Sequence, residues 1–436
     1  MIGFEQYENH LSELLAQSIV RGPLASLDAV SLALDGQAGR VLRLVTEQDA
    51  LDGAGAFFTG QHLANQLVAP WKRELQDGKI RLFDAACGGG DLLLAVARCL
   101  PVQPKLSATL REWGDILYGC DIHPTFVRTS KLRLALLASQ RCVIRDKVPP
   151  LNKLLPGIRC GDFLRGRWLE SMTHVVMNPP FTLANALPSC QWAQGLVNQA
   201  GVFVQKSLVR ASSEVKIAAI LPDVLRTGSR YRRWRDSIQD LATIQSIKVS
   251  GRFDAVADVD VFFLHLQRQE VVATQSIRWW GETNRTTIGD FFRVNVGSVV
   301  PHRDPLRGDR APFFDTGCTP IWKVLREPTR WRKHEGRLFS PPFVVVRRTS
   351  SPSDIHRACA SIVATRSAAA IENHLLVLTP KDGTIKACRA LMESLRQPAA
   401  SRWLNKRIRC RHLTVDAVAK IPFEGDAVKD SETTHV

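Results

Sequence analysis

The sequence predicts an α/β protein with a doubly wound, mostly parallel sheet of seven strands, preceded by N-terminal helices and followed by a basic C-terminal domain. Strand-like and helix-like segments alternate regularly between residues 81 and 267, which is typical of parallel sheets with helices on both faces. Three consecutive glycines, Gly88-Gly89-Gly90, follow the first strand-like segment, as at a tight strand-to-helix turn. The alternation stops near residue 270, where a second domain is expected to begin.

Each element of the sheet is expected from its apolar pattern. The first 50 residues have an amphipathic helical pattern. The expected strands cover residues 81–87, 117–122, 158–164, 174–177, 216–222, 244–250 and 259–267, and the expected helices cover 92–100, 125–139, 199–212 and 231–241. The chain is therefore divided into a helical segment 1–54, a sheet domain 55–270, a second domain 271–423 and a polar tail 424–436 that is expected to be disordered.

Charge and composition narrow the function classes. The 436 residues carry a net charge of +16, and residues 271–436 contribute 27 Lys and Arg against 16 Asp and Glu. A basic second domain favours a polyanionic partner. No apolar run approaches the ~18 residues that span a bilayer, and the N-terminus lacks a signal-peptide pattern. Ten cysteines without a CxxC pair favour a cytoplasmic protein with neither a metal site nor disulfides.

The strand at 174–177 ends in Asn178-Pro179-Pro180-Phe181, the most informative segment of the chain. Two prolines cannot continue a sheet ladder, and Pro179 restricts Asn178 to extended conformations. The result is a rigid corner that holds an amide beside an aromatic ring. The Asn178 oxygen and a backbone carbonyl can accept the two hydrogens of an exocyclic amine, while the ring stacks on its base.

Polar residues follow the other strands at the same edge of the predicted sheet. Asp84 and the glycine turn follow the first strand, Asp121 ends the second, and Asp162 follows the third. Ligands of open α/β sheets bind beyond the carboxyl ends of the strands. The turn has neither the Lys-Ser/Thr of a phosphate-binding loop nor the spacing of a dinucleotide fingerprint.

These segments, taken in order, resemble the class I S-adenosylmethionine-dependent methyltransferases, and most closely the N6-adenine DNA methyltransferases of gamma motif order. Upstream, the segment from Gly55 to Gly60 resembles that family's Phe-Tyr-Thr-Pro element, although Gly60 replaces its proline. Ala85 likewise replaces the proline of the family's cofactor motif. The resemblance covers roughly residues 55–268 and implies S-adenosylmethionine as the cofactor and double-stranded DNA as a partner.

The resemblance also implies roles for individual residues. The corner would be catalytic, with Asn178 and the Pro179 carbonyl as acceptors, Pro180 keeping the corner rigid, and Phe181 stacking on a flipped-out adenine. Phe253 would cover the other face of that base, whereas Phe262 and Phe263 are expected in the core. The cofactor would be held by Phe58, Thr59, Asp84, Ala86, Cys87, Gly88, Gly90, Asp121, Ile122, Asp162 and Phe163.

Arginines supply the expected DNA contacts. The run from Arg226 to Arg235 lies at the catalytic edge of the predicted sheet, and further clusters lie in the second domain, which the resemblance implies is a target-recognition domain. The expected DNA-binding residues are Arg226, Arg230, Arg232, Arg233, Arg347, Arg348, Arg407 and Arg409. A modification or defence system, with a separate restriction or defence subunit as partner, fits this reading.

Other functions remain open at this point. A corner of the same Asn-Pro-Pro-aromatic type also serves enzymes that methylate the N4 amine of cytosine, RNA bases or protein glutamine. A DNA-binding specificity or scaffold subunit with an inactive cofactor site is the non-enzymatic alternative. Cofactor binding separates the scaffold from the enzymes, and labelled cofactor incubated with DNA, RNA and protein separates the enzymes from one another.

Overall fold

The structure, a computed structural model, describes residues 2–21, 27–35, 38–39, 41, 59–186, 190–253, 259–269, 279 and 285–424. Two compact units make up the chain: Met1–Arg226 with Arg230–Ile277, and Thr227–Ser229 with Arg278–Val436. Phe58 and the expected tail beyond Glu424 lie outside the described residues. None of the described helices combines the length and apolar character that crossing a membrane requires.

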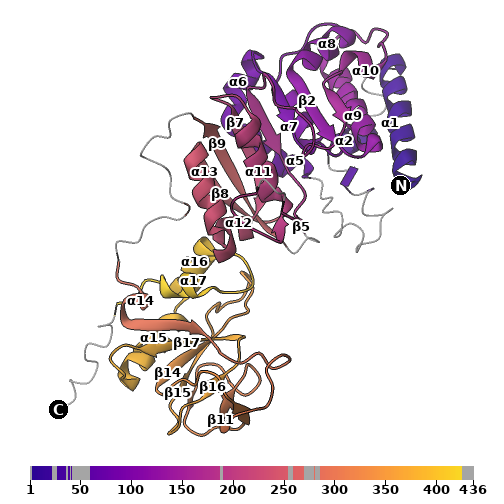
Figure 1. Ribbon diagram of the computed structural model, residues 1–436. Helices are drawn as coiled ribbons and strands as arrows, with labels where there is room; N and C mark the ends of the chain where they lie inside the picture. The colour runs from indigo at the N-terminus through magenta and orange to yellow at the C-terminus, as the bar shows by residue number, and fades with distance from the viewer. Residues whose placement is uncertain are drawn as a thin grey trace, which may run out of the picture. The chain divides into compact units, whose positions relative to one another are not determined.

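The first unit is built on a seven-stranded sheet with the order β3-β2-β1-β4-β7-β9-β8 (Figure 1). Neighbouring strands from β3 to β7 are parallel, whereas β9 is antiparallel to both β7 and β8. The predicted doubly wound, mostly parallel sheet is therefore confirmed. The strands are β1 Leu82–Asp84, β2 Leu117–Asp121, β3 Ile158–Cys160, β4 His174–Met177, β7 Lys216–Pro222, β8 Ala242–Arg252 and β9 Asp260–Arg268.

Helices cover both faces of this sheet. The buried side chains of Ala218, Ile220 and Phe263 belong to the same core cluster as α5, α7 and α9, so these helices lie on one face. Helices α11 and α13 pack against each other and against β7 and β8 on the opposite face (Figure 1). The bounds are α5 Gly60–Val68, α6 Lys72–Asp77, α7 Asp91–Ala97, α8 Leu106–Ile116, α9 Pro124–Arg141, α10 Leu151–Leu154, α11 Gln199–Arg210, α12 Asp223–Thr227 and α13 Arg232–Leu241, with the 3-10 turns η2 Ala69–Trp71 and η3 Ser229–Tyr231.

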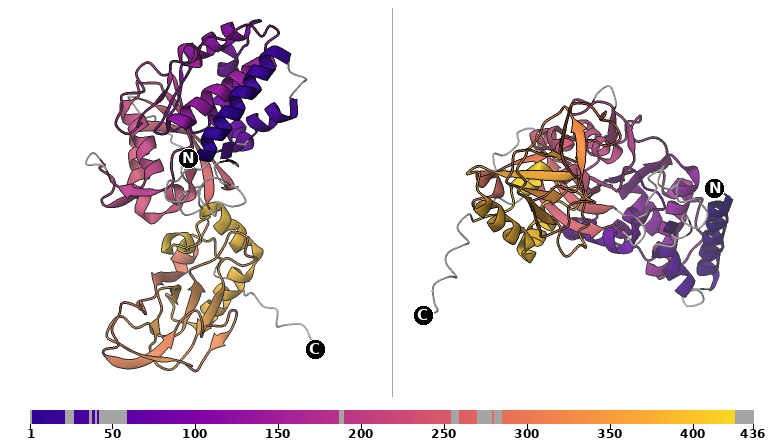
Figure 2. Two further views of the ribbon diagram at one scale, coloured as in Figure 1. Left: turned by 90° about the vertical axis from the view of Figure 1, so that its right-hand side faces the viewer. Right: turned by 90° about the horizontal axis from the view of Figure 1, so that it is seen from below.

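The N-terminal helices belong to the same core. Helix α1, Ile2–Arg21, runs beside α9 in both views (Figures 1 and 2), and α2, Leu27–Leu34, also contacts α9. The Ser18 and Ser139 hydroxyls are 2.8 Å apart, and Arg128 Nε lies 2.6 Å from Glu8 Oε1. The helical pattern expected in the first 50 residues is confirmed where the structure describes them.

The register aligns the carboxyl ends of the central strands. Asp84, the last residue of β1, pairs with Gly119 of β2 and with Val176 of β4. Asp121, the last residue of β2, pairs with Cys160, the last of β3. The polar residues that follow these strands are thus brought to one edge of the sheet. A small antiparallel hairpin, β5 Leu183–Asn185 and β6 Leu196–Asn198, follows the corner after β4.

The second unit contains two sheets that the pattern of its sequence did not reveal. A five-stranded sheet has the order β10-β17-β14-β15-β12, and a three-stranded sheet has the order β13-β11-β16. Its strands are β10 Phe292–Val296, β11 Asp309–Phe314, β12 Val324–Leu325, β13 Trp331–His334, β14 Phe343–Arg347, β15 Ala360–Val363, β16 Ala370–Ile371 and β17 Leu375–Pro380, and its helices are α14 Ile288–Phe291, α15 Ile385–Arg396, α16 Pro398–Arg407 and α17 Val415–Ala419.

Candidate active site

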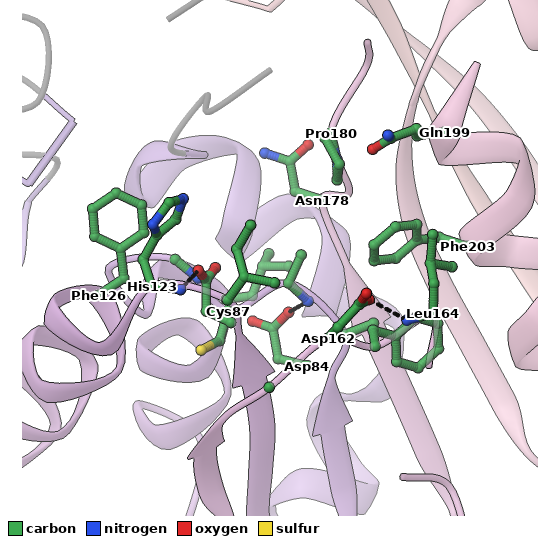
Figure 3. Close-up of a pocket in the computed structure, with 18 of the residues that line it drawn as sticks. Asp84, Cys87, His123, Phe126, Asp162, Leu164, Asn178, Pro180, Gln199 and Phe203 are labelled. Carbon is green, nitrogen blue, oxygen red and sulfur yellow. Dashed lines mark hydrogen bonds between the residues drawn. The ribbon is translucent and has the colours of Figure 1, made fainter. Parts of the chain in front are cut away.

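A cavity of about 270 Å³ opens at the carboxyl edge of the central strands. It lies where ligands bind in open α/β sheets. In Figure 3, Asn178 and Pro180 lie above Asp84, with His123 and Phe126 to the left and Asp162 and Phe203 to the right. The lining residues are Thr59, Asp84, Ala85, Ala86, Cys87, Gly88, Asp91, Leu92, Asp121, Ile122, His123, Phe126, Gly161, Asp162, Phe163, Leu164, Asn178, Pro180, Gln199 and Phe203.

The glycine turn forms one wall of the cavity and is held by its own backbone amides. Cys87 N donates to the Cys120 carbonyl at 2.9 Å, and Gly88 N donates to Asp121 Oδ2 at 3.0 Å. Gly90 has a φ of 88°, and a Cβ on this residue would lie 2.9 Å from Ser130 Oγ. Only glycine fits there, because the backbone is left-handed and packs directly against α9.

A buried ion pair fixes the helix that follows this turn. Asp91 Oδ1 lies 2.9 Å from Arg133 Nη1, and both side chains are almost fully buried. The other carboxylate oxygen of Asp91 accepts a hydrogen bond from Gly60 N at 3.0 Å. Asp91 therefore joins the start of α7 to α9 and to the segment that carries Thr59.

Asp84 presents a carboxyl group with an unused oxygen. The residue is 1% exposed, and Oδ1 accepts a hydrogen bond from Ala86 N at 3.3 Å. Among the described residues, Oδ2 is buried without a hydrogen-bond partner. Burial raises the pKa of Asp84 to about 8, and the negative charges of Asp121 and Asp91 act in the same direction. Such a group is suited to a positively charged ligand that would restore its ionised form.

Asp121 lies across the turn from Asp84 and uses one oxygen for each of two backbone donors. Oδ2 accepts from Gly88 N at 3.0 Å, and Oδ1 accepts from His123 N at 2.9 Å. Burial raises its pKa, and these two hydrogen bonds oppose the shift. Each oxygen of a carboxylate can accept a second hydrogen bond, so hydroxyl groups of a ligand can still bind here.

Aromatic rings form the opposite wall. Phe163 is 2% exposed and stacks on Phe203, with ring centroids 5.1 Å apart and an interplanar angle of 26°. Asp162, next to it, accepts a hydrogen bond from Leu164 N at 2.8 Å through Oδ1. A flat heterocycle with an amine at its edge matches an apolar wall that ends in a carboxylate.

Asn178 reaches the cavity from the end of β4. Its Nδ2 donates to Thr59 Oγ1 at 3.0 Å, and both residues line the cavity. Pro180 also lines the cavity, whereas Pro179 and Phe181 do not. The Phe181 carbonyl instead accepts a hydrogen bond from Asn198 Nδ2 at 2.6 Å, which ties the corner to the start of α11.

The two rings that were expected to enclose a target base lie against each other. The centroids of Phe181 and Phe253 are 5.8 Å apart, and the rings meet edge to face at 83°. Phe253 is 5% exposed and belongs to the core cluster on the α5, α7 and α9 face. Phe262 and Phe263 are 0% and 1% exposed, so their expected place in the core is confirmed.

Of the residues expected to hold the cofactor, all but two line the cavity. Gly90 shapes the turn without lining the cavity, and Phe58 lies outside the described residues. Sequence analysis missed Gln199 and Phe203, which face the cavity from the first turns of α11. Their spacing of four residues on one helix face was the available signal. It also missed His123 and Phe126, at the start of α9 directly after Asp121.

The arginines expected to bind DNA fall into two groups. Arg230, Arg232 and Arg233 are exposed around the start of α13. Arg226 is 2% exposed and forms an ion pair with Asp223 at 2.7 Å, and Arg407 is 9% exposed and pairs with Asp416 at 2.8 Å.

Both buried guanidinium groups therefore form ion pairs inside the protein, and their expected contact with DNA stays a prediction. Arg347 and Arg348 are half-buried and donate to backbone carbonyls, and Arg409 is also half-buried.

No protein-family model matches the sequence, and no curated protein sequence matches it. Solved structures do match. The type IIL restriction-modification enzyme MmeI, solved in complex with DNA, is 11% identical with a TM-score of 0.53, over 88% of this chain and 70% of MmeI. The type IIG restriction endonuclease BpuSI is 13% identical with a TM-score of 0.44, over 93% of this chain and 62% of that enzyme.

A third match is a Listeria monocytogenes protein described as a class I S-adenosylmethionine-dependent methyltransferase. It is 14% identical with a TM-score of 0.37, over 56% of this chain and 70% of that one. The likeness to MmeI extends over most of this chain and shows a shared fold. The α/β fold with its seven-stranded, parallel-rich sheet is thus part of the likeness to MmeI.

Proposed function

We propose that this protein transfers the methyl group of S-adenosylmethionine to the N6 amine of a flipped-out adenine in DNA. The observation that supports it best is the shared cavity of Asn178, Thr59, Asp84 and Asp121. One cavity then holds an acid with an unused oxygen, an acid suited to hydroxyl groups, and an amide at a rigid corner.

The cavity fits S-adenosylmethionine by the chemistry of its donors and acceptors. Asp84 Oδ2, buried without a partner in the described residues, would accept from the ammonium group of the methionine part. Asp121 would accept from the ribose hydroxyls, and Asp162 from the adenine amine beside Phe163. When bound, the cofactor supplies an activated methyl group on a sulfonium sulfur.

Asn178 has the central role at the reacting amine. The lone pair of an aromatic amine is delocalised into its ring, so the amine is a poor nucleophile. Acceptors that bind both N–H groups increase the electron density on nitrogen and stabilise the transition state electrostatically. Asn178 Oδ1 and the Pro179 carbonyl would be those acceptors, and the hydrogen bond from Nδ2 to Thr59 keeps the amide in one orientation.

The second unit would serve target recognition and hold the duplex. The charge of residues 271–436 supports this, with 27 Lys and Arg against 16 Asp and Glu. Lys and Arg that contact phosphates supply most of the affinity of a protein for DNA, and few residues read base edges. A modification or defence system is the setting that we propose, with a separate restriction or defence subunit as an additional partner.

The test is a product analysis. The purified protein is incubated with isotopically labelled S-adenosylmethionine and unmethylated genomic DNA, and the DNA is digested to nucleosides for mass spectrometry. We expect label in N6-methyladenine and none in N4-methylcytosine. Label in cytosine, or in RNA or protein offered in parallel reactions in place of DNA, would overturn the adenine proposal. Failure to bind the cofactor by calorimetry would favour an inactive scaffold instead.

Two variants make the product analysis specific. Asn178→Ala should abolish methylation and leave cofactor affinity within a few-fold of the wild type, because Asn178 is proposed to contact the target amine. Asn65→Ala is the matched control, since Asn65 is an exposed residue of α5 outside the cavity. Full turnover by Asn178→Ala would show that the corner takes no part in catalysis.

A further inference from the structure

The antiparallel pair β11 and β13 forms a ribbon with one exposed, basic face. Arg310 pairs with Lys333, and Pro312 pairs with Trp331. Residues directly opposite each other in an antiparallel pair point to the same side, and alternate residues point to opposite sides. Arg310, Lys333 and Trp331 therefore share one face, which we call the ribbon face.

Most of the reverse side of the ribbon packs against the rest of the unit, and Asp309 at its end is exposed. Ala311 and His334 are 4% and 8% exposed, and the guanidinium carbon of Arg332 lies 5.8 Å from the centre of the Phe313 ring. Arg332 Nη2 also donates to the Asp304 carbonyl at 2.7 Å, which anchors the loop before β11. The ribbon face thus lies on the paired part of β11 and β13, within the three-stranded sheet, and is fixed from behind.

The ribbon face combines an exposed tryptophan with two exposed cations. Trp331 is 48% exposed, the largest exposure of any tryptophan in the described residues. The guanidinium carbon of Arg310 lies 5.4 Å from the centre of the Trp331 ring, so the arginine is held over the indole. Arg310 and Lys333 are both exposed, and neither has an ion-pair partner within the described part of the chain.

Charge near the ribbon face favours a polyanion. Arg303 is 80% exposed, and Arg307 is exposed in the same loop, which leads into β11. The register places Asp309 on the reverse side with His334. Two-stranded β-ribbons fit the major groove of B-DNA, where flanking cations reach the phosphates. A protein partner would also bury a tryptophan and an arginine, but unpaired cations on both strands match a phosphate backbone better.

We propose that the ribbon face is a contact surface for duplex DNA, with the cross-strand pair Arg310 and Lys333, beside Trp331, contacting backbone phosphates. This surface rests on the proposed function and deepens it, because it names where the substrate duplex is held. It also replaces the buried Arg226 and Arg407 as the cations that meet the phosphates.

The test compares two double variants of the full chain that lose equal charge. R310Q/K333Q removes both cations of the ribbon face. K386Q/R389Q is the control, because Lys386 and Arg389 are exposed on α15, outside the β13-β11-β16 sheet. Affinity for a fluorescent duplex of mixed sequence is measured at several salt concentrations, together with cofactor affinity and thermal midpoint.

For R310Q/K333Q we expect at least tenfold weaker DNA binding. The slope of log affinity against log salt should fall by roughly 2, because each phosphate contact contributes about 0.9. Cofactor affinity and the thermal midpoint should match the wild type, and K386Q/R389Q should bind DNA as the wild type does. Trp331→Ala should weaken DNA binding further in the R310Q/K333Q background.

The outcomes separate this surface from the proposed function. Methylation of DNA with unchanged affinity and salt slope in R310Q/K333Q overturns the ribbon face alone. Equal losses in both double variants also overturn it, since they would reflect net charge. DNA binding that depends on the ribbon face without any methylation supports the surface and overturns the proposed reaction. A wild-type protein that does not bind duplex DNA overturns both.

Discussion

Asn178 Nδ2 donates a hydrogen bond to Thr59 Oγ1 at 3.0 Å, although the two residues are 119 positions apart in the chain. Thr59 directly precedes α5, and Asn178 follows β4, so the bond joins two elements at the edge of the cavity. It uses the donor side of the Asn178 amide. Asn178 Oδ1, the atom that would accept from a substrate amine, therefore points away from Thr59.

Thr59→Val should slow methylation without preventing it. Valine has the same shape as threonine and lacks the hydroxyl that accepts from Asn178. A neutral hydrogen bond contributes about 0.5–1.5 kcal/mol, so we expect kcat to fall roughly twofold to tenfold in single-turnover experiments. Thr59→Ser keeps the hydroxyl and should remain close to the wild type. Equal rates for the valine and serine variants would show that this bond does not orient Asn178.

Asp84 should make the stability of the cofactor-free protein depend on pH. Its pKa rises from 3.8 to about 8 on folding because the carboxyl group is buried. Between these values the unfolded chain releases the proton while the folded protein retains it. The contribution of Asp84 to stability is therefore fully present below about pH 4 and is lost as the pH rises toward 8.

Asp84→Asn removes this titration and provides the measurement. The thermal midpoint of the variant should exceed that of the wild type by an amount that grows from pH 5 to about pH 8, where Asp84 titrates in the folded protein. Its affinity for S-adenosylmethionine should fall, because the uncharged amide cannot form an ion pair with the ammonium group of the cofactor. A constant difference in midpoint across this range would mean that Asp84 titrates normally.

Asn198 should act as a positioning residue for the corner. Its Nδ2 donates to the Phe181 carbonyl at 2.6 Å, and its Oδ1 accepts from Ala200 N at 3.1 Å as the N-cap of α11. Asn198→Ser keeps a cap acceptor and loses the donor to Phe181. We expect a several-fold lower kcat with unchanged cofactor affinity and a small change in thermal midpoint.

Asn198→Ala separates the two contributions, since it loses the cap as well. It should be as slow as the serine variant and less stable by about 1 kcal/mol. A serine variant with wild-type kcat, beside a slow alanine variant, would assign the effect to the helix cap and leave the corner independent of Asn198.

Arg357 should stabilise the second unit from inside. It is 0% exposed, and its guanidinium donates to the carbonyls of Ile408 and Cys410 and to Asn405 Oδ1. Arg357→Met leaves these acceptors buried without their donor, which costs about 3 kcal/mol or more in the free energy of unfolding. Denaturant unfolding measures this, with the exposed Arg389→Met as control. Equal stability of the two variants would contradict the assignment.

The pattern of the sequence predicted the first unit well and the second unit poorly. The observed bounds of β4 and β7 match the expected strands residue for residue. β1 and β3 are shorter than expected because the chain turns away at Ala85 and at Gly161 to shape the cavity. In the second unit, β12 and β16 are only two residues long and pair with strands that are distant in the chain. Strands this short leave no periodic pattern in the sequence from which they could be predicted.

Local chemistry and chain order determined much of this protein by themselves. The alternation of elements implies a parallel sheet, whose carboxyl edge must collect Asp84, Asp121, Asp162 and Asn178. Tertiary structure alone decided which side chains are exposed and can contact a ligand or DNA. It buried Arg226 and Arg407 in ion pairs, placed Phe181 against Phe253, and exposed Arg310 and Lys333 around Trp331. Burial and cross-strand register depend on contacts between distant segments, which a local pattern of residues does not contain.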